Sequence, residues 1–339
     1  MNTQSKPVDD GNSNPLPLQL MQMIDGYWVS QAVHVAAKLG VADHLSDAPQ
    51  TSDALAQKVD AEPKAFYRLL RACASFGLFT EVEPATFALT PLGALLRSQA
   101  QGSLRDRAMF VAAPGHWLPW GKLEQAVRSG KPTFRDACGM EMWEYYAQNQ
   151  DEGMHFAKTM GHLSAWVAQD VVTQCDVSRF KMIVDVGGNE GVLLTALLQV
   201  APSAQGILFD LPHVIEKAPE IDRAEPVSGD FFQEVPKGGD LYLLKHILHD
   251  WDDERCAAIL KNVHRAAQPN SKLLVMEMLV PEQPEPSPVF YLDLTMLVLL
   301  EGRERTRQEF ETLLSGAGFE VERVTPTSSM ISIIEAVRV

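Results

Sequence analysis

A histidine followed by carboxylates lies in the run KHILHDWDDE at 245–254. The run continues an apolar stretch typical of a buried strand, so we expect His249 at the carboxyl end of that strand, where open parallel sheets bind ligands. An imidazole at this position can act as a general base. We expect His246 to line the same pocket or to pack, and Asp252 or Asp253 to cap the next helix.

A histidine base needs help to deprotonate a phenol-like hydroxyl, because in water the transfer from a pKa near 10 to one near 6.5 is uphill by about 5 kcal/mol. Positioning and a carboxylate that fixes the imidazole tautomer offset this. Glu277 is one candidate, because a carboxylate inside the apolar run VMEMLVPE needs a partner. Glu304 is the other, although between Arg303 and Arg305 it is also typical of a surface residue.

A glycine loop with the sequence DVGGNEG spans 185–191 and joins an apolar strand to a helix. Tight strand-to-helix turns use glycine for geometry alone, but the loop also fits a ligand approaching the backbone closely. Asp210 ends the next strand, 19 residues after Gly191, where an acid can bind ribose hydroxyls. Asp230 and Phe231 end the third strand and suit the amino group and ring of adenine.

The charges of this loop distinguish between adenosine cofactors. Glu190 stands where a dinucleotide would place its pyrophosphate, and the negative charges of the carboxylate and the pyrophosphate would repel each other. Asn189 replaces a glycine of the dinucleotide pattern GxGxxG, and the loop has no lysine or arginine. The sulfonium of S-adenosylmethionine is positive and carries no phosphate, which suits Asp185 and Glu190. The sequence therefore favours S-adenosylmethionine, with a nicotinamide oxidoreductase as an alternative.

The elements that must position these residues alternate between strands and helices from Lys181 onward. Near-continuous apolar strands in this order predict an α/β fold with a Rossmann-like, doubly wound parallel sheet. The last two strands, around FEVERVTPT and MISIIEAVRV, are expected to pair as an antiparallel C-terminal hairpin. We assign residues 109–339 to this domain, beginning with a helical segment at 109–180 that is rich in methionine and aromatic residues. Most of these are expected in the core, and some as walls for a flat apolar ligand.

A smaller, mainly helical domain is expected at 16–108, after a flexible polar leader at 1–15. Thr51 or Ser52 can cap one helix and Pro63 can start a second, which Gly77 ends. The alternating run FTEVEPATFALT then predicts a two-stranded wing. Such a winged helix can bind DNA as a repressor or serve as a packing and dimerisation module.

Composition narrows these possibilities. The 29 Lys and Arg against 44 Asp and Glu give a net charge of −15 over 339 residues, which disfavours nucleic acid as a partner. Four cysteines without a CxxC pair indicate free thiols rather than a zinc site. The N-terminus lacks a signal peptide pattern, and the most apolar run, 291–300, is half a membrane span long. We expect a soluble cytoplasmic protein that binds no membrane.

Six runs, in this order and spacing, resemble one family: DVGGNEG, FDLPHVI, GDFF, LLKHILHDWDDERC, VMEMLVPE and GRERTRQEFETLLSGAGF. They resemble the S-adenosylmethionine-dependent O-methyltransferases of the plant caffeate and bacterial antibiotic type. The resemblance covers essentially the whole chain, and it implies that the N-terminal winged-helix-like domain forms a homodimer.

The resemblance implies roles by position. His249 is the general base, flanked by Glu277 and Glu304, and Met160 contacts the substrate. His246 is the second candidate for a substrate contact, from its place in the strand rather than from the resemblance. The cofactor-binding residues are Gly187, Asp210, Asp230, Phe231, Lys245 and Trp251. Asn189 departs from the family, which usually has glycine there, and we expect the loop to survive with weaker cofactor binding.

The sequence thus predicts methyl transfer from S-adenosylmethionine to a hydroxyl of a small aromatic natural product, with S-adenosylhomocysteine as the other product. A phenazine is the first candidate acceptor, ahead of a quinone or a polyketide phenol. No metal is expected, because no clustered acidic site is evident in the sequence. A methyltransferase-fold enzyme with non-methylating chemistry and a winged-helix DNA-binding regulator remain alternatives.

Overall fold

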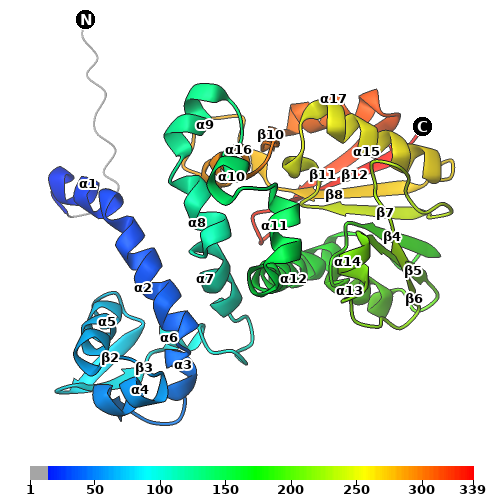
Figure 1. The fold of residues 1–339 in the computed structure, drawn as a ribbon. Helices are drawn as coiled ribbons and strands as arrows, with labels where there is room; N and C mark the ends of the chain where they lie inside the picture. The colour runs from blue at the N-terminus through cyan, green and yellow to red at the C-terminus, as the bar shows by residue number, and fades with distance from the viewer. Residues whose placement is uncertain (1–13) are drawn as a thin grey trace, which may run out of the picture. The chain divides into compact units, whose positions relative to one another are not determined.

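The computed structural model describes residues 14–339, so the predicted leader at 1–15 lies outside the described part except for its last two residues (Figure 1). The chain separates into two compact units, of which the first ends at Ala112 and the second spans Ala113–Val339. From residue 14 onward, no helix is both long enough and apolar enough to cross a membrane.

The first unit contains the expected helix, turn, helix and wing. Thr51 accepts a hydrogen bond from the backbone of α4 (Ser52–Lys58) and caps it, and Glu62 caps α5 (Pro63–Ser75) in the same way. The wing is the antiparallel pair β2 (Phe79–Glu83) and β3 (Thr86–Leu89), with β1 (Gln50–Thr51) on the other side of β3. The remaining elements are α1 (Leu16–Ile24), α2 (Gly26–Lys38), α3 (Val41–His44), α6 (Pro91–Ala94) and α7 (Arg105–Val111).

The second unit begins with helices, as expected for 109–180. These are α8 (Pro114–Trp120), α9 (Leu123–Ser129), α10 (Phe134–Cys138), α11 (Met142–Gln148) and the long α12 (Gln150–Gln174). Tyr146 of α11 and Phe156 of α12 stack with ring centroids 5.3 Å apart, and Trp143 meets Phe156 edge-on. Much of the aromatic content therefore joins these helices to one another, as the core interpretation expects.

A seven-stranded sheet forms the centre of the second unit, in the order β11-β12-β8-β7-β4-β5-β6. The five strands from β6 to β8 are parallel, and β12 and β11 complete the sheet as the antiparallel hairpin that the sequence predicts. The strands are β4 (Met182–Val186), β5 (Gln205–Asp210), β6 (Ala224–Ser228), β7 (Leu241–Lys245), β8 (Lys272–Glu277), β11 (Phe319–Pro326) and β12 (Ser332–Arg338).

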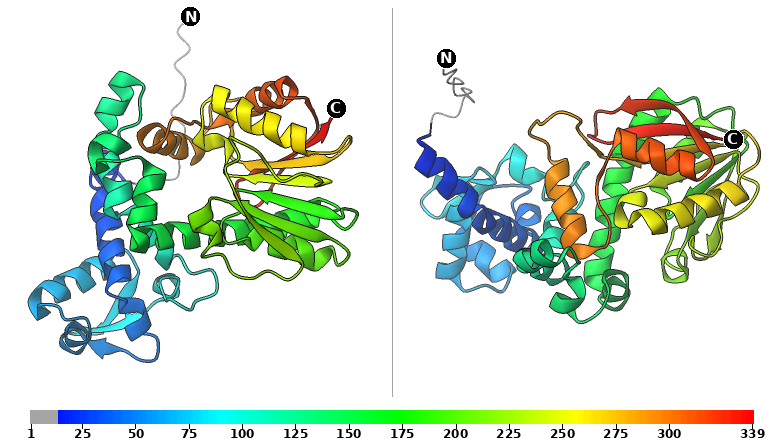
Figure 2. Two further views of the ribbon diagram at one scale, coloured as in Figure 1. Left: turned by 45° about the vertical axis from the view of Figure 1, so that its right-hand side comes forward. Right: turned by 90° about the horizontal axis from the view of Figure 1, so that it is seen from above.

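Helices cover both faces of the sheet (Figure 2). On one face α12 and α13 (Val192–Val200) bury Val167 and Leu194. On the other, α15 (Asp253–Ala266) and α17 (Arg307–Gly316) bury Ile259 and Phe310. The shorter elements are α14 (Pro212–Ile215), the 3-10 turn η1 (Leu248–Asp250), β9 (Leu279–Val280), α16 (Val289–Leu299) and β10 (Arg305–Thr306).

The parallel strands bring the residues of interest to one edge. Because β4, β5, β7 and β8 run in the same direction, their carboxyl ends place the glycine loop, Asp210, the His249 turn and Glu277 along the same side of the sheet.

Candidate active site

The turn that carries His249 is held by a buried carboxylate at the end of β8. Oε1 of Glu277 accepts hydrogen bonds from three successive backbone amides, those of Ile247 at 3.1 Å, Leu248 at 2.9 Å and His249 at 3.3 Å. Three donors converging on one oxygen stabilise an anion that the surrounding apolar strand would otherwise disfavour. Glu277 therefore shapes the backbone of the turn as well as facing the imidazole.

The imidazole of His249 is buried among acids. Its Nδ1 lies 2.7 Å from Oε1 of Glu304 and 3.8 Å from Oε2 of Glu277, and its Nε2 lies 3.4 Å from Oδ1 of Asp250. The short contact to Glu304 favours a proton on Nδ1 and leaves Nε2 as the nitrogen that can accept one. The surface interpretation of Glu304 is wrong, because only 3% of this residue is exposed.

These charges change the proton affinity of the whole cluster. Burial alone would lower the pKa of His249, but the charges of Glu277, Asp250 and Glu304 outweigh burial and raise it to about 10. Burial raises the pKa of Glu277 to about 7 and that of Asp250 to about 6, although the positive charge of His249 opposes both shifts. The site therefore holds protons more tightly than isolated side chains do.

An acidic cluster does exist here, contrary to the expectation from the sequence. His249, Glu277 and Glu304 each offer one ligand atom within 4.8 Å of the others. The sequence predicts these three residues as a base and its flanking carboxylates, but they come from separate segments of the chain, so no ligand-spacing pattern marks them as a possible metal site. The absence of a metal stays a prediction.

Two further residues hold the turn that carries His249, and the sequence indicated this role for neither of them. Arg305 is fully buried, and its guanidinium donates to the carbonyls of Leu248 and Trp251, each at 2.8 Å. Oδ1 of Asp253 accepts from the same guanidinium at 2.7 and 2.9 Å. Asp252, not Asp253, caps α15. The only sequence signal for Arg305 is its place next to Glu304 in the charged run GRERT, and such runs usually lie on the solvated surface.

Gly302 contacts the other side of this turn. A Cβ atom placed on Gly302 would lie 1.9 Å from the carbonyl oxygen of His249 and 2.4 Å from the carbonyl carbon of Asp250. The segment from Gly302 to Arg305 therefore clasps the turn with its backbone and with two buried side chains.

The glycine loop lies directly beside the turn that carries His249. Gly187 adopts a positive φ of 71°, and a Cβ atom there would lie 2.4 Å from Cδ1 of Ile247. Asn189 also has a positive φ, 53°, and Gly191 precedes α13 with a φ of 69°. Asn189 therefore adopts the left-handed conformation, which asparagine tolerates better than most residues, and the loop keeps its turn.

The acids of this loop and of β5 fit a cationic nucleoside ligand. Asp210 is fixed by backbone amides, since Asn189 N–H donates to its Oδ2 at 2.8 Å and Leu211 N–H to its Oδ1 at 2.7 Å. Burial raises the pKa of Asp210. Asp185 is buried, its pKa is raised to about 7 by burial, and its Oδ2 has no hydrogen-bond partner among residues 14–339. An unpartnered carboxylate oxygen at the loop is suited to an ammonium or sulfonium group.

The residues predicted to hold adenine also gather near the loop. Phe231 lies 3.9 Å from the Cβ position of Gly187, and its ring is 6.1 Å from that of Trp251. Asp230 accepts the amide of Phe232, which fixes its carboxylate at the end of the strand. Lys245 has a pKa lowered by burial, against the opposing charge of Asp185.

The two predicted substrate contacts differ in what surrounds them. The ring of His246 stacks on that of His249, with centroids 4.9 Å apart and 27° between the planes. Its φ is 53°, its buried Nε2 has no partner in the described chain, and burial holds its pKa well below the usual value. Such strain in a non-glycine residue is typical of functional sites. Met160 lies half-buried on α12.

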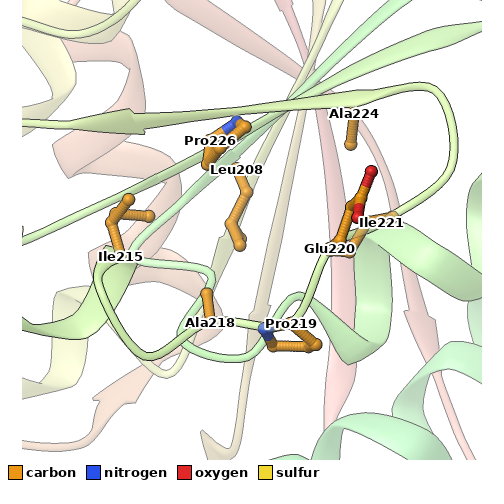
Figure 3. Close-up of a pocket in the computed structure, with 8 residues that line it drawn as sticks. All are labelled: Leu208, Ile215, Ala218, Pro219, Glu220, Ile221, Ala224 and Pro226. Atoms are coloured by element: carbon orange, nitrogen blue, oxygen red, sulfur yellow. The ribbon is translucent and has the colours of Figure 1, made fainter.

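A separate apolar pocket of about 200 Å³ lies beside β5 and the segment after α14 (Figure 3). None of the predicted catalytic or cofactor-binding residues lines it, so this pocket is not the candidate active site. Its lining residues are Leu208, Ile215, Ala218, Pro219, Glu220, Ile221, Ala224 and Pro226.

Comparison with known proteins identifies the arrangement. Residues 120–320 match a family model described as an O-methyltransferase domain, and residues 21–99 match an O-methyltransferase dimerisation domain. Phenazine O-methyltransferase PhzM of Lysobacter antibioticus is 44% identical over 95% of this chain and 96% of its own length.

Solved structures agree with this match. The crystal structure of LaPhzM superposes with a TM-score of 0.93 at 43% identity, over 96% of this chain and all of that one. Human N-acetylserotonin methyltransferase in complex with SAM gives a TM-score of 0.90 at 27% identity, over 97% and 99% of the two chains.

Proposed function

This chain belongs to the family of S-adenosylmethionine-dependent O-methyltransferases, and we propose that it methylates a phenolic hydroxyl of a phenazine with His249 as general base. The observation that carries the proposal is the 2.7 Å contact between Nδ1 of His249 and Glu304, on a buried turn that touches the glycine loop through Ile247 and Gly187. This contact leaves Nε2 of His249 as the proton acceptor.

Cofactor binding is assigned to the loop side of the sheet edge. We expect Gly187 to contact the methionine part, Asp210 the ribose, and Asp230 with Phe231 the adenine, with Lys245 and Trp251 adjacent. When bound, S-adenosylmethionine supplies a methyl group on a sulfonium sulfur, and S-adenosylhomocysteine leaves as a neutral sulfide. Asp185, whose Oδ2 has no hydrogen-bond partner among residues 14–339, offers its carboxyl group to such a cation, and a cation bound there would favour the ionised form that burial disfavours.

His249 performs the proton transfer. The acceptor O–H bond would break and its proton would pass to Nε2 of His249, so that the oxygen could take the methyl group as the methyl carbon–sulfur bond breaks. Glu304 stabilises the resulting imidazolium through Nδ1, while Glu277 keeps the turn in place. Because the surrounding carboxylates raise the pKa of His249 to about 10, its neutral imidazole has a proton affinity close to that of a phenol, so the transfer is nearly balanced once His249 is neutral, a form that becomes more populated as the pH rises.

Two observations support the acceptor class: the similarity to PhzM and the side chains of the helical segment that carries Met160. The related PhzM is a phenazine O-methyltransferase, and the half-buried Met160 lies on α12 four residues after Phe156, whose ring packs against Trp143 and Tyr146 of α11. Flat apolar rings suit such surfaces. We also assign His246 to acceptor binding, since its unpartnered Nε2 can bond a polar group of the acceptor.

A product assay tests this function. The purified protein is incubated with methyl-labelled S-adenosylmethionine and a hydroxyphenazine, with unsubstituted phenazine as the matched control, and products are identified by mass spectrometry. A labelled methoxyphenazine from the first compound alone is expected. No product from any hydroxyphenazine, in a protein that binds S-adenosylhomocysteine, would refute the phenazine assignment.

The dimerisation domain supports a homodimer, and we assign its surface to α1 and α2. These helices expose large apolar side chains that a monomer rarely leaves in water. The exposed residues are Leu16, Leu18, Leu20, Met21, Met23, Ile24, Tyr27, Trp28, Val29 and Val35. Light scattering should show a dimer for the wild type and a monomer for the Met23→Glu, Trp28→Glu double variant, and a dimer in both would place the interface elsewhere.

A further inference from the structure

Asn189 occupies the glycine loop in a conformation that glycine adopts most easily. Its φ is 53°, between Gly188 and Glu190. Asparagine is better tolerated in this region than most residues, but it remains less favourable there than glycine. If the position needed only backbone freedom, an asparagine would bring no advantage, so its side chain is the feature to explain.

The backbone and the side chain of Asn189 reach two different parts of the site. Its N–H donates to Oδ2 of Asp210, the predicted ribose ligand, at 2.8 Å. Its side-chain Nδ2 donates to the carbonyl oxygen of Ala157 on α12 at 3.0 Å. One residue thus joins the end of β5, the glycine loop and a helix more than thirty residues earlier in the chain.

Helix α12 approaches the loop closely at this point. One turn beyond Ala157, a Cβ atom on Gly161 would lie 3.4 Å from Oε2 of Glu190 and 3.6 Å from Cγ2 of Val192. Met160, the predicted substrate contact, stands between Ala157 and Gly161. The same stretch of α12 therefore meets the glycine loop and carries Met160. We call the part of α12 around Met160, residues 157–161, the acceptor wall.

We propose that Asn189 is a positioning residue that ties the cofactor loop to α12, so that cofactor binding also orders the acceptor wall. The proposal rests on the proposed function, because it assumes that the loop binds S-adenosylmethionine. It assigns Asn189 no contact with reacting atoms. Its effect passes through Asp210 on one side and Ala157 on the other.

Calorimetric titration with S-adenosylhomocysteine separates the side chain from the backbone. Asn189→Gly keeps the positive φ and removes the bond to Ala157, so we expect binding about five- to tenfold weaker than in the wild type. Asn189→Asp keeps the size and loses the donor, and should bind no more tightly than Asn189→Gly. Asn270→Gly is the control, since Asn270 also has a positive φ, 66°, on an exposed turn. It should bind like the wild type.

The outcomes discriminate between the two levels of the account. Equal or tighter binding by Asn189→Gly, or wild-type binding by Asn189→Asp, would overturn the role of the side chain. A wild-type protein that binds no S-adenosylhomocysteine would instead refute the proposed function.

Hydrogen exchange gives a readout independent of affinity. At saturating S-adenosylhomocysteine, amides of α12 around residues 157–161 should become protected in the wild type and much less so in Asn189→Gly. Equal protection in both proteins would show that the loop and α12 are not coupled through Asn189.

Discussion

The glycine loop at 187–191 and the His249 turn at 246–251 lie side by side, but different interactions shape them. The loop is shaped by positive φ angles at Gly187, Asn189 and Gly191 and by the backbone amide of Asn189, which donates to Asp210. The turn is shaped by buried charges, with Glu277 below its amides and Arg305 on its carbonyls.

This difference predicts how each region responds to substitution. Removing one member of a buried charged network leaves the others uncompensated, which is strongly destabilising. Removing a neutral hydrogen bond from the loop forfeits about 1 kcal/mol. Substitutions in the His249 turn should therefore destabilise the protein or abolish turnover, whereas substitutions in the glycine loop should mainly change the affinity for the cofactor.

Gly302→Ala should have the largest effect on stability, because its Cβ would lie 1.9 Å from the backbone carbonyl oxygen of His249. The clash involves the backbone of residue 302 and that of residues 249–251, and neither can move without displacing the residues packed around it. We therefore expect at least about 3 kcal/mol of destabilisation or failure to fold. Gly316→Ala on α17 is the control, since nothing lies within 4 Å of its Cβ position. The melting temperatures of the two variants should differ widely. Equal melting temperatures would contradict the close packing of Gly302 against the His249 turn.

Glu304→Gln should reduce kcat about 10²- to 10³-fold, because the amide cannot stabilise the imidazolium of His249. The negative charge of Glu304 contributes to the raised pKa of His249, so its loss lowers that pKa. Since only neutral His249 accepts a proton, wild-type kcat/KM should rise with pH from neutral toward about 10. In Glu304→Gln this rise should shift to lower pH.

A control for the pH profile is the binding of S-adenosylhomocysteine, which should be close to wild type in Glu304→Gln. An unchanged pH profile in that variant would mean that Glu304 does not set the proton affinity of His249.

Gly187→Ala should weaken S-adenosylhomocysteine binding about tenfold and cost about 1–2 kcal/mol of stability. The strain arises from its φ of 71° and from a Cβ contact at 2.4 Å with the tip of Ile247, a side chain that can turn away. Calorimetry and thermal melts measure the two effects. A melt as strongly altered as that of Gly302→Ala would remove the distinction between loop and turn.

Asp253→Asn should have the smallest effect, a three- to tenfold loss of kcat with unchanged cofactor affinity. The carboxylate holds Arg305, but 61% of its side chain is exposed, so water screens much of the interaction. Glu254→Gln, a neighbouring exposed carboxylate, is the control. If both variants have wild-type kcat, Asp253 does not orient Arg305.

Local patterns predicted much of this molecule. The alternation after Lys181 predicted the parallel sheet, and the late runs predicted the antiparallel hairpin of β11 and β12. The position of His249 at a strand end followed from the apolar run before it. These features depend on neighbouring residues, whose periodicity the sequence displays directly.

Contacts between distant segments could not be predicted in the same way. Arg305 in GRERT has the pattern of an exposed charge, yet it is buried because the carbonyls of Leu248 and Trp251 face it from another strand end. The bond from Asn189 to Ala157 likewise depends on how α12 packs on the loop. Nothing in the local sequence specifies either partner.

The most direct test of the account is the comparison of binding and turnover in His249→Ala. We predict S-adenosylhomocysteine binding within about threefold of wild type and a loss of kcat of about 10³-fold or more toward the hydroxyphenazine acceptor. Turnover within tenfold of the wild type, in a variant that binds S-adenosylhomocysteine normally, would contradict the assignment of His249 as the general base.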